Sequence, residues 1–219
     1  ARPAAAARED FELLYIGVLE ERRNIRFLFE VLAEAAKTVP GLRLTLVGKG
    51  EADYRDECFA YAKELGVWDR IDYTERVPQS QVHELYDRAN LFVLPTRYEI
   101  FGMVLLEAMY FGLPVLTSLN GGSDLLVQDG VNGFVQRGFD AKAYARVIAE
   151  LAADPQRQET GGKSGPRNGG AGLLVGPHCR QNAGGIPEGL VIGPAFSTQN
   201  QKTVENAAGR TANPNIRSD

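Results

Sequence analysis

Short apolar runs alternate with segments of helical periodicity over the first two thirds of the chain. The runs have the length and composition of buried strands, and they predict strands at residues 11–16, 42–47, 71–73, 91–94 and 114–117. In the intervening segments apolar residues recur every three or four positions, which predicts helices at about 24–39, 51–65, 80–89, 103–111 and 140–154. Because strands that alternate with helices form parallel sheets, we predict an α/β fold with a single doubly wound, Rossmann-like sheet.

Polar residues at the ends of these segments indicate where helices begin. Asn24, Ser80 and Asp140 precede helical segments and can act as N-caps, because their side-chain oxygens accept hydrogen bonds from unpaired backbone N–H groups. The segments 120–122 and 129–133 have the asparagine, aspartate and glycine content of turns, and we predict turns there.

Composition divides the chain into three parts. Residues 1–10 are predicted to be a linker and residues 11–155 the folded domain. Residues 156–219 contain half of the chain's 24 glycines and no sustained helical periodicity, which predicts an irregular tail that is disordered or non-native. The chain does not begin with methionine, and residues 1–10 lack the apolar core of a signal peptide, so we expect a piece of a longer protein.

Net charge and the rare residue types narrow the function classes. A formal net charge of −4 argues against a nucleic-acid-binding protein that relies on bulk charge. Cys58 and Cys179 lack metal-binding or redox spacing, and the chain has only two histidines, so no metal site is predicted. Cys58 is expected to be a small buried hydrophobe. No apolar run approaches the ~20 residues that span a membrane.

Three glycine-bearing turns follow predicted strands, at Gly17, at 48–50 and at 100–102. Ligands of open α/β sheets bind at the carboxyl ends of the strands, and a helix that begins there offers unpaired N–H groups to phosphate. The turn at 48–50 has Asp53 where a dinucleotide-binding motif has its third glycine, and no Walker-type motif lies near the turns. The pattern therefore disfavours a dehydrogenase or a P-loop NTPase.

Charged residues near these turns suit a diphosphate, although each has a simpler explanation. Arg22, Arg23 and Lys49 can bind phosphate oxygens, or they can be solvated charges balanced by Glu20 and Glu21. Two carboxylates lie on either side of the third turn. Glu107 lies inside an apolar helix, where an unpartnered carboxylate is costly, and we expect it to face ligand hydroxyls. The alternative is that Glu107 binds the N-terminus of its own helix and that Glu99 is solvated.

Taken together, these segments resemble the donor-binding, C-terminal half of a GT-B glycosyltransferase of the retaining glycosyl transferases group 1 type (family four). The resemblance covers about residues 11–154. The segment at 94–109 is the most specific, because it has the Glu-x7-Glu pattern of the family as Glu99 and Glu107. The other matching segments are 15–25, 46–50, 112–116 and 129–134.

The resemblance implies a role for each matching position. Glu99 is implied to be the catalytic carboxylate beside the transferred sugar, and Glu107 to accept hydrogen bonds from the ribose hydroxyls of the donor. Gly17, Gly48 and Lys49 are implied to line the donor site. The diphosphate and sugar are implied to bind the turn formed by Ile100, Phe101, Gly102, Met103 and Val104, with Arg23 in place of the phosphate-binding lysine of the family. The backbone at Val77 is implied to contact the base.

The sequence departs from the family pattern at four places. Val18 replaces a common arginine, so we expect Arg22 to supply that diphosphate contact. Ile100 replaces a common glycine beside the sugar, and Glu75 replaces another, which changes the fit of the donor sugar. Asp124 follows the glycine pair one position earlier than usual.

A family enzyme of this kind transfers a sugar from a nucleoside diphosphate sugar to an acceptor hydroxyl, with retention and without a cofactor or an obligatory metal. Nothing in the chain resembles the N-terminal acceptor domain, so we expect donor binding with little turnover. The resemblance implies that this acceptor domain is the partner of the chain and that it makes any peripheral contact with the membrane. The expected location is the cytoplasm, or the inner face of the membrane. No nucleic-acid partner is expected. The alternatives are a non-catalytic nucleotide-sugar-binding module or subunit, and a nucleotide-sugar epimerase of the same architecture.

Overall fold

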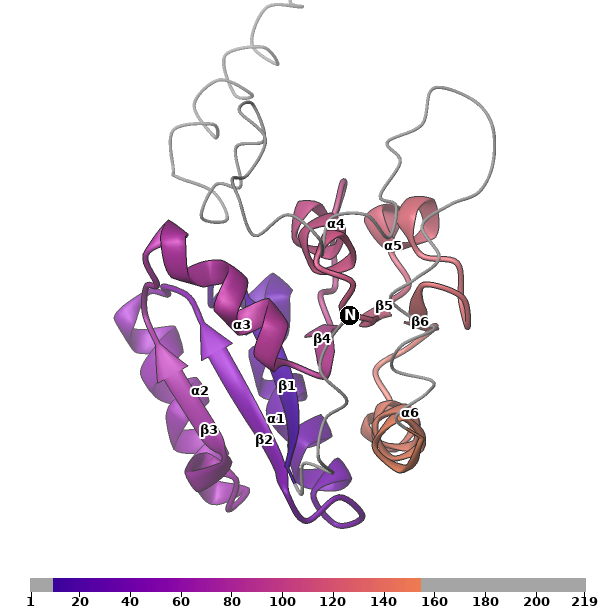
Figure 1. Ribbon diagram of the computed structural model, residues 1–219. Coiled ribbons are helices and arrows are strands. Elements are labelled where there is room, and N and C mark those ends of the chain that lie inside the picture. The colour runs from indigo at the N-terminus through magenta and orange to yellow at the C-terminus, as the bar shows by residue number, and fades with distance from the viewer. Residues whose placement is uncertain (1–9, 155–219) are drawn as a thin grey trace, which may run out of the picture.

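The computed structural model describes residues 10–154 as one parallel sheet with helices on both faces (Figure 1). The strand order is β3-β2-β1-β4-β5-β6, and all neighbouring strands are parallel. The strands are β1 (Phe11–Ile16), β2 (Leu42–Val47), β3 (Ile71–Thr74), β4 (Leu91–Leu94), β5 (Val115–Ser118) and β6 (Gly133–Gln136). The predicted doubly wound, Rossmann-like α/β fold is confirmed. The predicted tail and all of the predicted linker except Asp10 lie outside the described residues.

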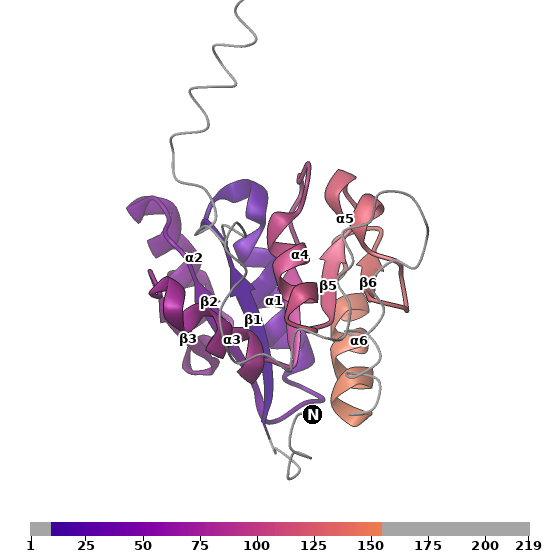
Figure 2. The ribbon, with the colours of Figure 1, turned by 45° about the horizontal axis from the view of Figure 1, so that its top comes forward.

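Helices connect the strands in alternation. They are α1 (Ile25–Ala35), α2 (Ala52–Glu64), α3 (Val82–Arg88), α4 (Met103–Tyr110), α5 (Gly121–Leu126) and α6 (Ala141–Ala153). Short 3-10 turns are η1 (Glu21–Arg23), η2 (Trp68–Arg70) and η3 (Gln79–Gln81). Helix α1 packs against α2 and α6 on one face of the sheet, and α3, α4 and α5 lie on the other (Figures 1 and 2). No helix of the described part is long and apolar enough to cross a bilayer.

The order of the strands reverses between β1 and β4, which lie side by side at the centre of the sheet. Both strands are mostly buried, which explains why β4 is a continuous apolar run and why β1 is apolar except for the half-buried Glu12. In open α/β sheets the crevice outside the carboxyl ends of the strands at such a reversal is where ligands bind. The turns after β1 and β4 therefore flank the expected binding position.

Two elements differ from the prediction. Residues 120–122 and 129–133 were predicted to be turns only, but α5 begins at Gly121 and β6 at Gly133. Helix α5 begins with a capping box, in which Asn120 Oδ1 accepts a hydrogen bond from the Ser123 N–H (3.0 Å) and Ser123 Oγ accepts one from the Asn120 N–H (2.8 Å). Strand β6 is an edge strand with two half-buried apolar residues, so its sequence has no apolar run.

The three predicted N-caps have different outcomes. Asp140 is confirmed, because its Oδ1 accepts a hydrogen bond from the Lys142 N–H (2.9 Å). Asn24 directly precedes α1 but has a left-handed backbone (φ 58°) and makes no capping hydrogen bond. The prediction that Ser80 caps a helix is wrong, because Ser80 lies inside η3 and α3 begins two residues later. Cys58 is buried, as predicted.

Candidate functional site

The turns after β1 and β2 are bound to each other through their backbones. The Leu19 N–H donates to the Lys49 carbonyl (2.6 Å), and Leu19 pairs with Gly50 in an isolated parallel bridge. A Cβ atom added to Gly48 would lie 1.7 Å from the Gly17 carbonyl oxygen. No side chain fits in that space, so the close approach of the two turns is sufficient to require this glycine.

Arginine side chains connect the η1 turn after β1 to the loop after β4. Arg23 is buried, with 7% of its side chain exposed, and its Nη1 pairs with Glu99 Oε2. Its Nε makes no hydrogen bond and lies 3.8 Å from Glu20 Oε1. Arg22 is exposed, pairs with the same Glu20 oxygen (2.6 Å) and donates to the Tyr98 carbonyl (3.4 Å). Two guanidinium groups therefore lie at the carboxyl end of the central strands, and both have carboxylate partners.

Glu99 is a partly buried carboxylate with several donors around it. Its Oε1 accepts a hydrogen bond from the Ile100 N–H (3.1 Å). Burial raises the pKa of Glu99, but the charge and hydrogen bond of Arg23 lower it more, with help from the Ile100 and Gly102 N–H groups. The pKa of Glu99 is therefore below the ordinary value of a glutamate. The alternative in which Glu99 is simply solvated is wrong.

Glu107 has a different environment on α4. Its Oε2 accepts a hydrogen bond from Tyr86 Oη on α3 (3.2 Å). Burial raises the pKa of Glu107, and the Tyr86 hydrogen bond offsets part of that rise. The alternative in which Glu107 binds the N-terminus of its own helix is wrong, because its partner comes from α3.

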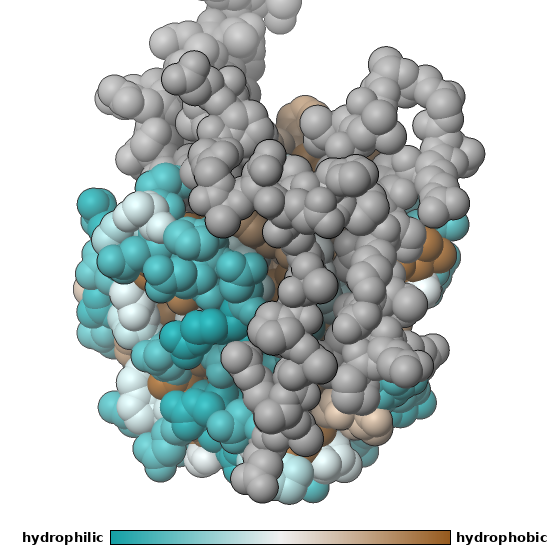
Figure 3. Space-filling view, viewed as in Figure 1, coloured by the Kyte–Doolittle hydropathy of each residue, from teal (hydrophilic) through white to brown (hydrophobic). Residues whose placement is uncertain are grey.

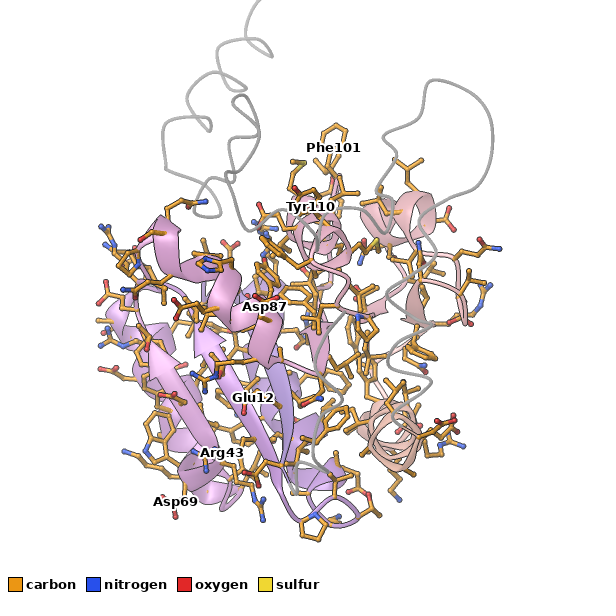
Figure 4. All side chains as sticks on the ribbon, in the orientation of Figure 1. Glu12, Arg43, Asp69, Asp87, Phe101 and Tyr110 are labelled. Atoms are coloured by element: carbon orange, nitrogen blue, oxygen red, sulfur yellow. The ribbon has the colours of Figure 1, made fainter. Side chains whose placement is uncertain are left out.

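The loop between β4 and α4 ends in a glycine turn. Gly102 precedes α4 with a left-handed backbone (φ 63°) and has no side chain to cap the helix, although its carbonyl accepts a hydrogen bond from the Leu105 N–H (2.8 Å). Gly122 of α5 packs against this loop, where an added Cβ would lie 2.9 Å from the Gly102 nitrogen. Within this loop the Glu99 side chain pairs with Arg23, whereas Phe101 projects from the molecule (Figure 4). The exposed apolar side chains of this loop and of the first residue of α4 are Tyr98, Ile100, Phe101 and Met103.

The remaining predicted residues lie on the β2–β3 side of the site. Lys49 is half exposed, and its Nζ lies 3.6 Å from Glu75 Oε1. Val77 follows β3 and is partly buried. The surface over β3 and α3 is mostly hydrophilic (Figure 3). No contact joins Lys49 or Val77 to the Arg23–Glu99 pair among the interactions of the described residues.

The structure thus brings Arg22, Arg23, Glu99 and Gly102 together, and it places Glu107 beside Tyr86. Glu20, which the sequence analysis named with Glu21 as a counter-charge, contacts both arginines. Sequence reasoning missed Tyr86 as a partner of Glu107. It also missed the close packing of Gly122. The Gly121-Gly122 pair was the available signal for that packing. Within residues 10–154 no three acidic, histidine or cysteine side chains are placed to hold a metal ion.

Comparison with known proteins relates this geometry to one family. The model of the family described as Glycosyl transferases group 1 matches residues 2–167. A D-inositol 3-phosphate glycosyltransferase of Segniliparus rotundus is 30% identical over 76% of the chain and 39% of its own length. A GDP-mannose-dependent alpha-(1-6)-phosphatidylinositol monomannoside mannosyltransferase of Mycolicibacterium smegmatis is 31% identical over 67% of the chain and 40% of its own length. The chain therefore spans about two fifths of these curated relatives.

Solved structures have the same fold. HepE of Anabaena, in a complex with UDP and glucose, superposes with a TM-score of 0.65 at 26% identity, covering 71% of this chain and 42% of HepE. Sucrose-phosphate synthase of Thermosynechococcus elongatus superposes with a TM-score of 0.66 at 30% identity, covering 73% of this chain and 40% of the synthase.

Proposed function

Because the chain belongs to the glycosyl transferases group 1 family, we propose that it binds a nucleoside diphosphate sugar as the donor half of a retaining glycosyltransferase. The observation that carries this proposal is the meeting of Arg23, Glu99 and the glycine turn of α4 at the reversal of the strand order. A cationic side chain and a helix N-terminus suit a diphosphate, and an adjacent carboxylate suits sugar hydroxyls.

In the proposed complex the diphosphate lies between the η1 arginines and the turn formed by residues 100–104. Arg22 and Arg23 neutralise phosphate oxygens, and the backbone N–H groups at the start of α4 donate to them. Lys49 adds a positive charge from the β2 turn, and Gly17 and Gly48 line the donor site with their backbones. Val77 contacts the base through its backbone.

In this proposal Glu99 and Glu107 bind different parts of the donor. Glu99 lies beside the transferred sugar, accepts hydrogen bonds from its hydroxyls and stabilises positive charge that develops at the anomeric carbon. Glu107 accepts hydrogen bonds from the ribose hydroxyls. A carboxylate suits two vicinal hydroxyls because it has two acceptor oxygens and no donor when ionised.

We propose transfer with retention. The bond between the anomeric carbon and the leaving phosphate oxygen breaks, and the nucleoside diphosphate takes the electron pair. The acceptor hydroxyl forms the new bond on the face that the leaving group shields, and its proton passes to the departing phosphate. The arginines and the helix N-terminus stabilise the negative charge on the leaving group, so the proposal requires no resident cofactor or metal.

The acceptor is assigned to a partner domain. The chain spans about two fifths of its relatives, and we propose that an N-terminal acceptor domain supplies the other wall of the cleft and any contact with the inner face of the membrane. The chain alone is then expected to bind donor and turn over little. A cytoplasmic location stays a prediction.

Calorimetric titration of the 219-residue chain with UDP, GDP, ADP and the corresponding glucose or mannose derivatives tests the proposal. We expect one base to be bound clearly more tightly than the others, and competition between the diphosphate and its sugar derivative. Absence of binding by all of them would overturn the proposal. Binding without transfer, after the acceptor domain is supplied, would favour a non-catalytic module, and release of an epimerised sugar nucleotide without acceptor would favour an epimerase.

A further inference from the structure

Tyr86 is held rigidly between the sheet and α4. It lies on α3 with 2% of its surface exposed. Its ring stacks on Phe111 with centroids 4.8 Å apart and planes 12° apart, and the ring of Phe92 on β4 lies 6.2 Å away. Stacked aromatic side chains of this kind have little freedom, so the position of the Tyr86 hydroxyl is fixed by packing.

The hydroxyl of Tyr86 is directed at Glu107. Its Oη donates to Glu107 Oε2 at 3.2 Å, across 21 residues of sequence. Glu107 is the one charged residue of α4, and neither β4 nor β5 carries a charge. The titratable residues of the neighbouring helices α3 and α5 are all exposed, except Tyr86 itself, and they are His83, Glu84, Asp87, Arg88 and Asp124. The neutral hydroxyl of Tyr86 is therefore the group that compensates the Glu107 carboxylate for its burial.

We propose that Tyr86 is a positioning residue for donor binding, which holds one oxygen of the Glu107 carboxylate so that the other oxygen faces the ribose hydroxyls. This inference rests on the function proposed above. An ionised carboxylate has about four acceptor sites, so the Tyr86 hydrogen bond leaves enough of them for two ligand hydroxyls. A fixed carboxylate also loses less rotamer freedom when the ligand binds.

The same hydrogen bond favours the ionised form of Glu107, which is the form that accepts from two hydroxyls. Burial raises the pKa of Glu107 and the Tyr86 hydroxyl lowers it. Removal of the hydroxyl in Tyr86→Phe is therefore expected to raise the pKa of Glu107 further. Donor affinity in this variant is expected to fall at a higher pH than in the wild type when the solution is acidified.

A ligand-free experiment tests the contact itself. The pKa of Glu107 is measured by carbon NMR of a glutamate-labelled chain in the wild type, Tyr86→Phe and Tyr144→Phe, with Glu107→Gln to assign the signal. Tyr144 is a fully buried tyrosine of α6 whose ring contacts Phe27, so it controls for the loss of a buried hydroxyl. We expect a higher pKa in Tyr86→Phe alone. An unchanged pKa of Glu107 in folded Tyr86→Phe would overturn the inference.

A second experiment tests the link to the ribose. The probe is the one of UDP, GDP and ADP that the wild type binds most tightly, together with its 2′,3′-dideoxy analogue. We expect Tyr86→Phe to bind the ribose form about three- to tenfold more weakly, the scale of one hydrogen bond, and the dideoxy form as the wild type does. Equal losses for both forms would overturn the inference while leaving the proposed function intact. Failure of the wild type to bind any of the three would overturn the proposed function instead.

Discussion

Glu99 and Glu107 are the same residue type at two ends of one motif, but the protein stabilises them differently. Glu99 pairs with the buried Arg23 and accepts backbone hydrogen bonds, and its pKa is lowered. Glu107 lies in an apolar helix with one neutral partner, and its pKa is raised by burial. The Glu99 carboxylate neutralises a buried guanidinium and therefore contributes to the stability of the fold. The Glu107 carboxylate is unfavourable for folding, which is typical of a residue retained for a ligand.

The largest expected effect is on stability at Glu99. The change Glu99→Ala leaves the buried Arg23 guanidinium with only Glu20, at 3.8 Å, as a counter-charge. Breaking a buried ion pair from one side costs about 3 kcal/mol of unfolding free energy. Urea unfolding followed by circular dichroism measures this loss. The control is Glu21→Ala, an exposed neighbour, which should change stability by less than about 0.5 kcal/mol. A loss below about 1 kcal/mol for Glu99→Ala would mean that the pair is solvated.

The next effect separates stability from binding at Glu107. Glu107→Ala should change the unfolding free energy by less than about 1 kcal/mol, because the lost Tyr86 hydrogen bond is offset by relief of a desolvated charge and by better helix propensity. Donor binding should weaken by about 1–3 kcal/mol, the scale of hydrogen bonds to a charged group. Calorimetry and urea unfolding of the same preparation measure both quantities. Unchanged affinity in the folded variant would remove Glu107 from the site.

This contrast between the glutamates could not be derived from the sequence. The Glu-x7-Glu pattern located both residues, and the apolar helix around Glu107 showed that it needs a partner. The partners themselves are distant along the chain, because 76 residues separate Arg23 from Glu99 and 21 separate Tyr86 from Glu107. Only the packing of η1 against the β4 loop, and of α3 against α4, selects these pairs among many charged and polar residues.

The fold was easier to predict than the site, and the reason is burial. The mostly buried strands β1, β2, β4 and β5 have predominantly apolar sequences, and these sequences predicted all four as strands. Strand β6 is an edge strand that needs few apolar residues, and the Asn120–Ser123 capping box of α5 overrides the turn propensity of Gly121 and Gly122. Local chemistry that depends on a reciprocal hydrogen bond is not visible in periodicity.

The pH dependence of stability should have opposite signs at the two positions. The lowered pKa of Glu99 gives stability that is present above the pKa of the unfolded chain and is lost as the pH falls through the folded value. The raised pKa of Glu107 gives stability that is present at low pH and is lost as the pH rises through the folded value. Relative to wild type, Glu99→Gln should therefore become less stable, and Glu107→Gln more stable, as the pH rises from about 3 to 7. Urea unfolding across that range measures both differences, and parallel curves would contradict the comparison.

The smallest effect is expected for an exposed ion pair on the other side of the site. Lys49 and Glu75 are 3.6 Å apart with about half of each side chain exposed, whereas Arg23 and Glu99 are mostly buried. Lys49→Gln should change the unfolding free energy by less than about 0.5 kcal/mol, because solvent screens such pairs. Donor affinity should fall a fewfold at low salt and less at high salt, since Lys49 would act on the diphosphate as a screened point charge. Equal losses of affinity at both salt concentrations would instead indicate direct, desolvated contact of Lys49 with the donor.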